Sequence, residues 1–141
     1  MADVLDIDQW GSLNRFGMYS DGIIDVPQCD LSCMISPEMF DEFELPYLAR
    51  EIESTAASVY HLDGPDALQH TESLCGIEAL DMIQWMPGEG YYEQDWSELN
   101  AEIDTLGKGQ IFQEYYNLTE ADILRIWQTY RSRKLFFRIG A

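Results

Sequence analysis

The chain has 141 residues, of which 46% are hydrophobic, so it is long and apolar enough for one domain with a packed core. Its formal net charge of −18 argues against nucleic acid and membrane surfaces as partners, because both attract basic patches. The acidic start does not resemble a signal peptide, and no apolar run approaches the roughly 20 residues that a membrane helix requires. We therefore expect a soluble cytoplasmic protein.

The three cysteines, Cys29, Cys33 and Cys75, are expected to be reduced thiols. An odd count without a secretory signal does not suit a disulfide framework. Cys29 and Cys33 are four residues apart, but no further Cys or His pair has zinc-finger spacing. A structural zinc module is not expected.

The first part of the chain is predicted to lead into a helix. Residues 1–22 are rich in Asp, Gly and Ser and are interpreted as an irregular lead-in, or as a short helix followed by a loop. Residues 23–35 end in a stretch that resembles a strand feeding a helix. Ser36 is a good N-cap and Pro37 suits the first helical position, so a helix is expected from about Pro37 to Ser54. Pro46 should kink or break it.

The rest of the chain alternates between short apolar runs and amphipathic segments. Gly64-Pro65, Gly76, Pro87-Gly88 and Gly107 punctuate these runs, and Thr119 is a candidate helix N-cap. We expect strands at about 59–62, 80–86, 108–113 and 135–139, and helices at 65–75, 93–106 and from Thr119 onwards.

This βα alternation predicts an α/β domain over residues 23–141 with a parallel sheet of five strands and about four helices. Five strands could form a small open doubly wound sheet. They could equally form half to five-eighths of a (β/α)8 barrel, whose usual length is about 250 residues. No glycine-rich phosphate loop is present, so nucleotide binding has little support.

Ligands of parallel α/β folds bind at the carboxyl ends of the strands, so the polar residues there are the candidate site. Trp85 at such an end can either pack in the core or contact a ligand. Arg138 can either offset nearby acids or lie beside a bound anion. The candidates at these ends are Cys29, Asp30, His61, Asp63, Gln84, Trp85, Gln113, Glu114 and Arg138.

His61 and Asp63 form the sharpest pair, because residues i and i+2 of a strand point to the same side. An imidazole and a carboxylate so placed could bind zinc or iron, with Glu114 as a third ligand from another strand. They could instead act as an acid–base couple in which Asp63 orients His61. In a purely structural interpretation, Asp63 caps the next helix and His61 satisfies a buried hydrogen bond.

Several of these segments resemble the uroporphyrinogen decarboxylase superfamily. The Tyr60-His61-Leu62-Asp63-Gly64-Pro65 segment takes the place of that superfamily's His-Ile-Cys-Gly segment. The resemblance covers about residues 23–141, the C-terminal part of a complete barrel. The other segments that carry it are Ile35–Phe40, Leu45–Leu48, Leu80–Gly88 and Gly107–Phe112.

The resemblance implies one of two activities. One branch decarboxylates a porphyrinogen without metal or cofactor. The other transfers a methyl group from a corrinoid protein to a thiol activated by zinc, which is bound by a His, a Cys two residues later and a further Cys. Here His61 matches the histidine, Asp63 replaces the first cysteine, and Glu114 lies near the strand of the second. Oxygen ligands make zinc a harder Lewis acid, which disfavours thiol activation.

The resemblance thus implies a metal-dependent methyltransferase that acts on a small molecule or a corrinoid-linked methyl group. His61, Asp63 and Glu114 would hold zinc, Asp63 would also be catalytic, and Trp85, Gln84, Gln113 and Arg138 would bind substrate. Corrinoid would enter only through a partner protein. Because a partial barrel exposes sheet edges, a second hypothesis is a non-catalytic subunit that assembles with itself or a companion chain. A cofactor-free decarboxylase is a third.

Overall fold

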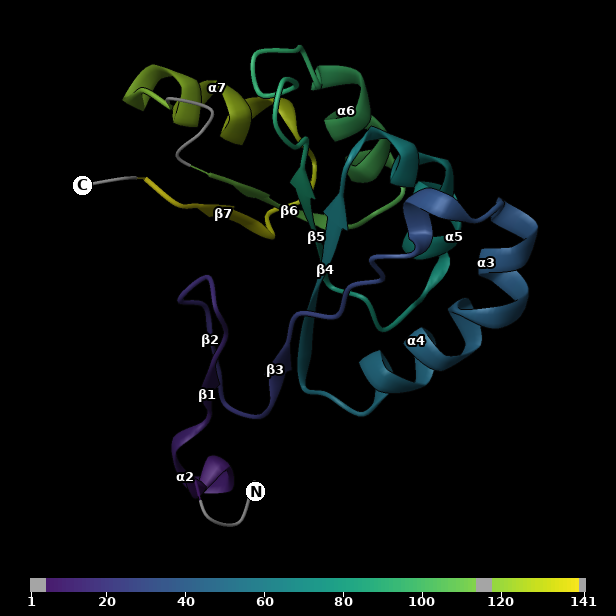
Figure 1. Ribbon diagram of the computed structural model, residues 1–141. Helices are drawn as coiled ribbons and strands as arrows, with labels where there is room; N and C mark the ends of the chain where they lie inside the picture. Colours follow the sequence, from purple (N-terminus) through teal and green to yellow (C-terminus); the bar gives the residue numbers. More distant parts are fainter. Residues whose placement is uncertain (1–4, 114–117, 140–141) are drawn as a thin grey trace.

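A computed structural model describes residues 5–113 and 118–139 of the chain (Figure 1). Its centre is a parallel sheet whose spatial order, β3-β4-β5-β6-β7, is also the chain order. The strands are β3 (Ile24–Asp25), β4 (Ala57–Asp63), β5 (Met82–Met86), β6 (Gly109–Phe112) and β7 (Leu135–Phe137). The predicted α/β class and the five parallel strands are confirmed.

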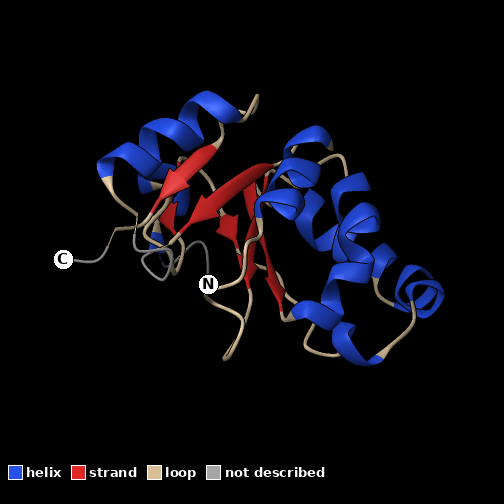
Figure 2. Cartoon of the chain, turned by 90° about the horizontal axis from the view of Figure 1, so that it is seen from above, coloured by secondary structure: helices blue, strands red, loops and turns tan. Residues whose placement is uncertain are grey.

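Strand neighbours that follow the chain order require every crossover to turn the same way, so the helices gather on one face of the sheet. Figure 2 shows them as an arc along one side of the strands, with loops of the N-terminal segment on the other side. The crossovers contain α3 (Pro37–Phe43), α4 (Leu45–Glu53), the 3₁₀ helix η2 (Pro65–His70), α5 (Thr71–Gly76), α6 (Ser97–Thr105) and α7 (Glu120–Thr129).

Local signals place several of these boundaries. The Ser36 hydroxyl accepts a hydrogen bond from the Met39 backbone N–H, and Pro37 follows at the first helical position. The predicted break at Pro46 is present, because α3 ends at Phe43 and α4 begins at Leu45. β4 ends at Asp63, and the next residue, Gly64, has a φ of 82°, in the left-handed region that favours glycine.

The first 35 residues differ from the prediction in part. The lead-in contains the short helix of one interpretation, α2 (Ile7–Trp10), but a two-stranded antiparallel ribbon of β1 (Ser12–Leu13) and β2 (Tyr19–Ser20) follows it. Within residues 23–35 only Ile24 and Asp25 form a strand, and the expected strand before Ser36 was wrong, because Ser32–Met34 form the 3₁₀ helix η1. Each strand of the ribbon has two residues, too few for a period-two pattern to be visible.

Two apolar layers cover the two faces of the sheet. On the helix side, Leu62, Ile83 and Trp85 pack with residues of α3 to α6, and Phe112 packs with Ile126 and Tyr130 of α7. On the opposite face, Val59, Met82 and Ile111 are buried beneath Phe16, Met18, Val26 and Phe136. The N-terminal segment therefore covers the face that the helices leave open, and His61 lies on that face, two residues beyond Val59.

Candidate functional site

His61 and Gln84 stand side by side on neighbouring strands, on the face opposite the helices. The register of β4 and β5 pairs His61 with Gln84, and Asp63 with Met86 at the end of each strand. His61 Nδ1 contacts Gln84 Oε1 directly. The sheet thus brings together two of the residues expected in the site, one from each strand.

The Gln84 side chain sets the orientation of the imidazole. Gln84 is fully buried, and its Nε2 donates to the Trp85 carbonyl oxygen over 3.2 Å. Its Oε1 is therefore the atom that faces His61, and an amide oxygen only accepts hydrogen bonds. In the neutral ring Nδ1 then carries the proton, and the lone pair is on Nε2.

The Nε2 atom of His61 points to the Asp63 carboxylate at the solvent edge of β4. His61 Nε2 and Asp63 Oδ2 are 3.9 Å apart, which is too long for a hydrogen bond. The His61 side chain is 15% exposed and that of Asp63 is 61% exposed. The largely buried imidazole nitrogen thus faces a solvated carboxylate without a direct hydrogen bond between them.

The other expected residues are distributed unevenly around this pair. Gln113 follows β6 directly and is 4% exposed, while Arg138 follows β7, is exposed and donates its backbone N–H to the Phe112 carbonyl oxygen over 2.8 Å. Trp85 is on the helix-covered face, where its ring meets that of Trp96 edge-on at 5.0 Å. The proposed ligand Glu114 lies outside the described residues.

Within the part of the chain that the structure describes, no three His, Cys, Asp or Glu side chains gather in a way that could hold a metal ion. His61 and Asp63 supply two donors at most. A metal at this edge therefore needs a third ligand from outside the described residues or from a bound molecule.

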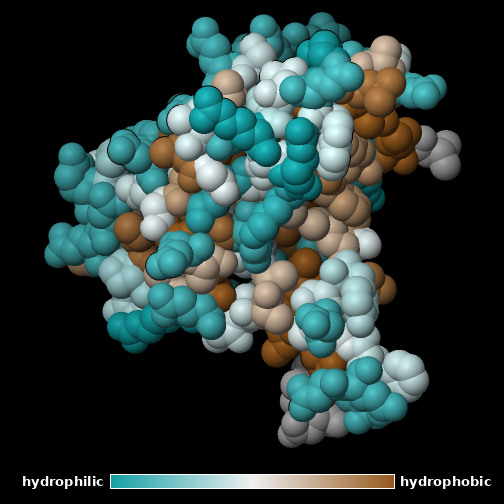
Figure 3. All heavy atoms as spheres, turned by 180° about the vertical axis from the view of Figure 1, so that it is seen from behind, coloured by the Kyte–Doolittle hydropathy of each residue, from teal (hydrophilic) through white to brown (hydrophobic). Residues whose placement is uncertain are grey.

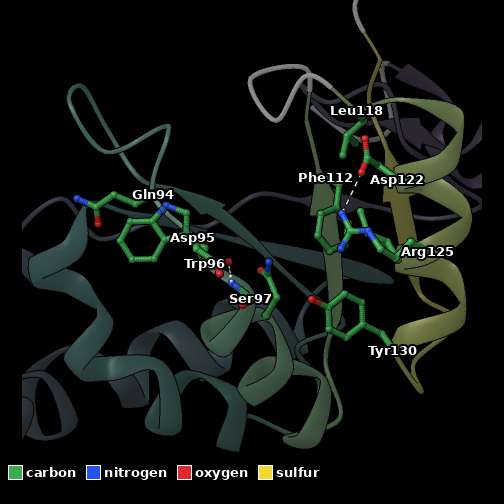
Figure 4. Close-up of a pocket in the computed structure, with 11 residues that line it drawn as sticks. Gln94, Asp95, Trp96, Ser97, Phe112, Leu118, Asp122, Arg125 and Tyr130 are labelled. Atoms are coloured by element: carbon green, nitrogen blue, oxygen red, sulfur yellow. Dashed lines mark hydrogen bonds and ion pairs between the residues drawn. The ribbon is translucent and has the colours of Figure 1, made fainter.

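The structure also contains a cavity that the sequence did not predict, between the N-terminal turns of α6 and α7. Among its lining residues are Trp96, Asn100, Phe112, Arg125 and Tyr130 (Figure 4). In the sequence, the signals in this region were the helix expected at 93–106 and the N-cap at Thr119, whose hydroxyl accepts from the Asp122 backbone N–H. Those signals predict two helices and say nothing of how the helices lie relative to each other.

Comparison of the chain with models of known protein families, with curated proteins and with solved structures finds no match. Among the helices that the structure describes, none combines the length and the apolar character needed to span a membrane.

Proposed function

We propose that the carboxyl edge of β4 and β5 is a metal-assisted site for a small-molecule substrate, with His61 and Asp63 as its central residues. The observation that carries the proposal is the contact between Gln84 Oε1 and His61 Nδ1, which leaves the Nε2 lone pair facing Asp63. A ring nitrogen whose partner nitrogen is fixed by a hydrogen bond is the usual arrangement of a metal-binding histidine.

The two donors are of the kinds that zinc binds. Tetrahedral zinc with bonds of about 2.0–2.2 Å holds two of its ligand atoms roughly 3.3–3.6 Å apart. The 3.9 Å between His61 Nε2 and Asp63 Oδ2 is slightly longer, so a small rotation of the exposed Asp63 side chain would bring both atoms within coordination distance. Zinc needs at least one further protein ligand, and Glu114, next to Gln113, remains the prediction for it. When bound by nitrogen and oxygen ligands, zinc supplies a Lewis acid at this edge.

Each protein residue has a distinct part in the proposed site. Gln84 holds the imidazole and selects the neutral tautomer whose lone pair is on Nε2, and Asp63 adds a carboxylate at the solvent side. Gln113 supplies an amide at the end of β6, and Arg138 supplies a cation beyond β7. The Trp85 side chain lies on the other face of the sheet. Trp85 is proposed to support the site through its backbone carbonyl oxygen, which accepts the hydrogen bond from Gln84 Nε2.

The reaction class that this proposal favours is methyl transfer to or from a small molecule, which the resemblance to corrinoid-dependent methyltransferases implies. In such a reaction the corrinoid would be carried by a partner protein. The donor pair is one nitrogen and one oxygen, with Asp63 where the resembling enzymes have a cysteine, and it favours an oxygen or nitrogen substrate atom over a thiol.

Zinc titration of metal-free protein by calorimetry tests the site. We expect saturable binding to the wild-type chain and at least about tenfold weaker binding to His61→Ala and Asp63→Asn, because each removes one ligand. Asp66→Asn is the matched control: it changes the charge equally, three residues further along, and should bind as the wild type does. Equal zinc affinity of His61→Ala and the wild type would contradict the proposal.

A further inference from the structure

The cavity between α6 and α7 is independent of the His61 site. It has a volume of about 200 Å³ and opens on the helix side of the sheet, where the turn before α6 and the first turns of α7 face each other. Figure 4 shows Gln94 and Trp96 on one side of the cavity, and Phe112, Asp122 and Arg125 on the other.

The floor of the cavity is apolar and aromatic. Phe112, Ile126 and Tyr130 are each less than a tenth exposed, and the rings of Phe112 and Tyr130 are stacked with centroids 6.0 Å apart. One polar pair lies among them, because the Tyr130 hydroxyl hydrogen-bonds the buried Asn100 side chain. Such a floor suits an apolar or aromatic group that enters from the rim.

The rim carries charges of both signs. The Asp95 carboxylate accepts the Ser97 backbone N–H over 2.9 Å, and the Asp122 carboxylate accepts Arg125 Nη2 over 3.0 Å. The hydrogen bonds from Ser97 hold the pKa of Asp95 below its ordinary value. The Thr119 hydroxyl, and after it Arg125, lower the pKa of Asp122, so both carboxyls are ionised at neutral pH. The ion pair with Asp122 uses one of the five N–H donors of a guanidinium, and Asp95 lies within electrostatic reach of Arg125.

We infer that this cavity binds a small zwitterion, an α-amino acid with an apolar or aromatic side chain. The side chain would occupy the floor of Phe112, Ile126 and Tyr130. The ligand carboxylate would bind Arg125, and its ammonium group would face Asp95. The volume is sufficient, because a cavity of about 150 Å³ already holds a benzene ring.

The mixed rim disfavours a ligand with a single charge. An organic anion would place its charge beside Asp95 and Asp122, while a simple cation would place its charge beside Arg125. A zwitterion gives Arg125 and Asp95 each a partner of opposite sign, while Asp122 keeps its ion pair with Arg125, and it buries an apolar group in the same step. Guanidinium groups bind carboxylates in a bidentate manner, which also fixes the orientation of the ligand.

The test is a titration of the full chain with L-phenylalanine, followed by calorimetry and by NMR of the Trp96 indole N–H, whose proton is donated to the Tyr91 carbonyl oxygen. Phenethylamine lacks the carboxylate and 3-phenylpropionate lacks the ammonium group. We expect saturable phenylalanine binding that shifts the Trp96 resonance. Each analogue should bind at least about tenfold more weakly, because one charge-assisted contact is lost.

Two variants complete the test. Arg125→Gln should weaken phenylalanine binding at least about tenfold, because it removes the carboxylate partner. Arg131→Gln removes the same charge from an exposed position outside the cavity lining, and it should bind phenylalanine as the wild type does. Three results would overturn the inference. The first is no saturable phenylalanine binding up to about 10 mM, and the second is equal affinity for phenylalanine and both analogues. The third is that the two variants lose phenylalanine affinity to the same extent.

Discussion

Asp122 forms a capping box with Thr119 at the N-terminus of α7. Its carboxylate accepts the Thr119 backbone N–H over 3.0 Å and the Thr119 hydroxyl over 2.6 Å, and its own backbone N–H donates to that hydroxyl. The Thr119 hydroxyl, the Arg125 guanidinium and the Thr119 N–H lower the pKa of Asp122 to about 2. The ionised form is therefore the one that stabilises the fold.

The capping box predicts a pH-dependent loss of stability. Because the folded-state pKa is below the ordinary 3.8, the contribution of Asp122 is present above about pH 4 and is lost as the pH falls towards 2. In thermal unfolding, the wild type should be more stable than Asp122→Asn at pH 6, and this difference should shrink towards pH 2. Glu120→Gln, an exposed change in the same turn, is the control. A difference that does not change with pH would contradict the account.

The sequence predicts an interaction well when its two residues are close along the chain, and poorly when they are far apart. The capping roles of Ser36 and Thr119 depend on neighbours three residues away, and both are confirmed. The His61–Gln84 contact depends on the register of two strands, 23 residues apart. The side on which Trp85 lies was equally hidden, because Met82 to Trp85 are all buried and show no alternation.

At the scale of the elements, Lys108 joins the loop before β5 to the start of β6. Its ammonium group is buried and donates to the carbonyl oxygens of Ile77 over 2.6 Å, Leu80 over 2.8 Å and Glu78 over 3.4 Å. Burial lowers the pKa of Lys108 from its ordinary value. The three hydrogen bonds offset that desolvation and fix the amino ends of two central strands.

Replacing Lys108 with Met should therefore destabilise the fold. The change leaves buried carbonyl oxygens without their donor, so we expect the free energy of unfolding in denaturant to fall by about 2–4 kcal/mol. Lys134→Met is the matched control, since Lys134 pairs with Asp81 on the surface and is 61% exposed. Its effect should be under about 1 kcal/mol. An equal fall in the free energy of unfolding in the two variants would show that the hydrogen bonds of Lys108 contribute no more stability than a surface ion pair.

The sequence predicted the elements themselves where the apolar spacing was long enough to show a period. The break at Pro46 and the alternation from β4 onward are confirmed, because proline and helical periodicity act locally. The ribbon of β1 and β2 and the cavity between α6 and α7 were missed. Both arise from contacts between segments, and the residues that form them carry no distinctive local pattern.

At the scale of the whole molecule, the N-terminal segment has an exposed apolar surface. Phe16 and Met18 cover the sheet, whereas Trp10, Leu13 and Tyr19 are each about two-thirds exposed. Figure 3 shows hydrophobic residues on this projecting segment and at the end that carries α7 and the C-terminus. Exposed apolar residues grouped in this way favour the second hypothesis, a partial barrel that assembles with another chain.

The exposed residues Leu13 and Tyr19 predict self-association through the N-terminal ribbon of β1 and β2. Light scattering of the full chain should give a mass above that of one chain, and Leu13→Glu should lower it, because the charge falls on the exposed side of β1. Phe43→Glu, an equally drastic change at an exposed apolar residue of α3, should leave the mass unchanged. A monomer at every concentration would exclude this mode of assembly.

The zinc site at the carboxyl edge of β4 is the central proposal, and a crystal soaked with zinc tests it most directly. The proposal predicts an anomalous peak between His61 Nε2 and Asp63 Oδ2, at roughly 2 Å from each, with a further protein ligand beside them. Crystals of His61→Ala should lose that peak. Anomalous peaks only at other positions, with the His61–Asp63 edge free of zinc, would contradict the account.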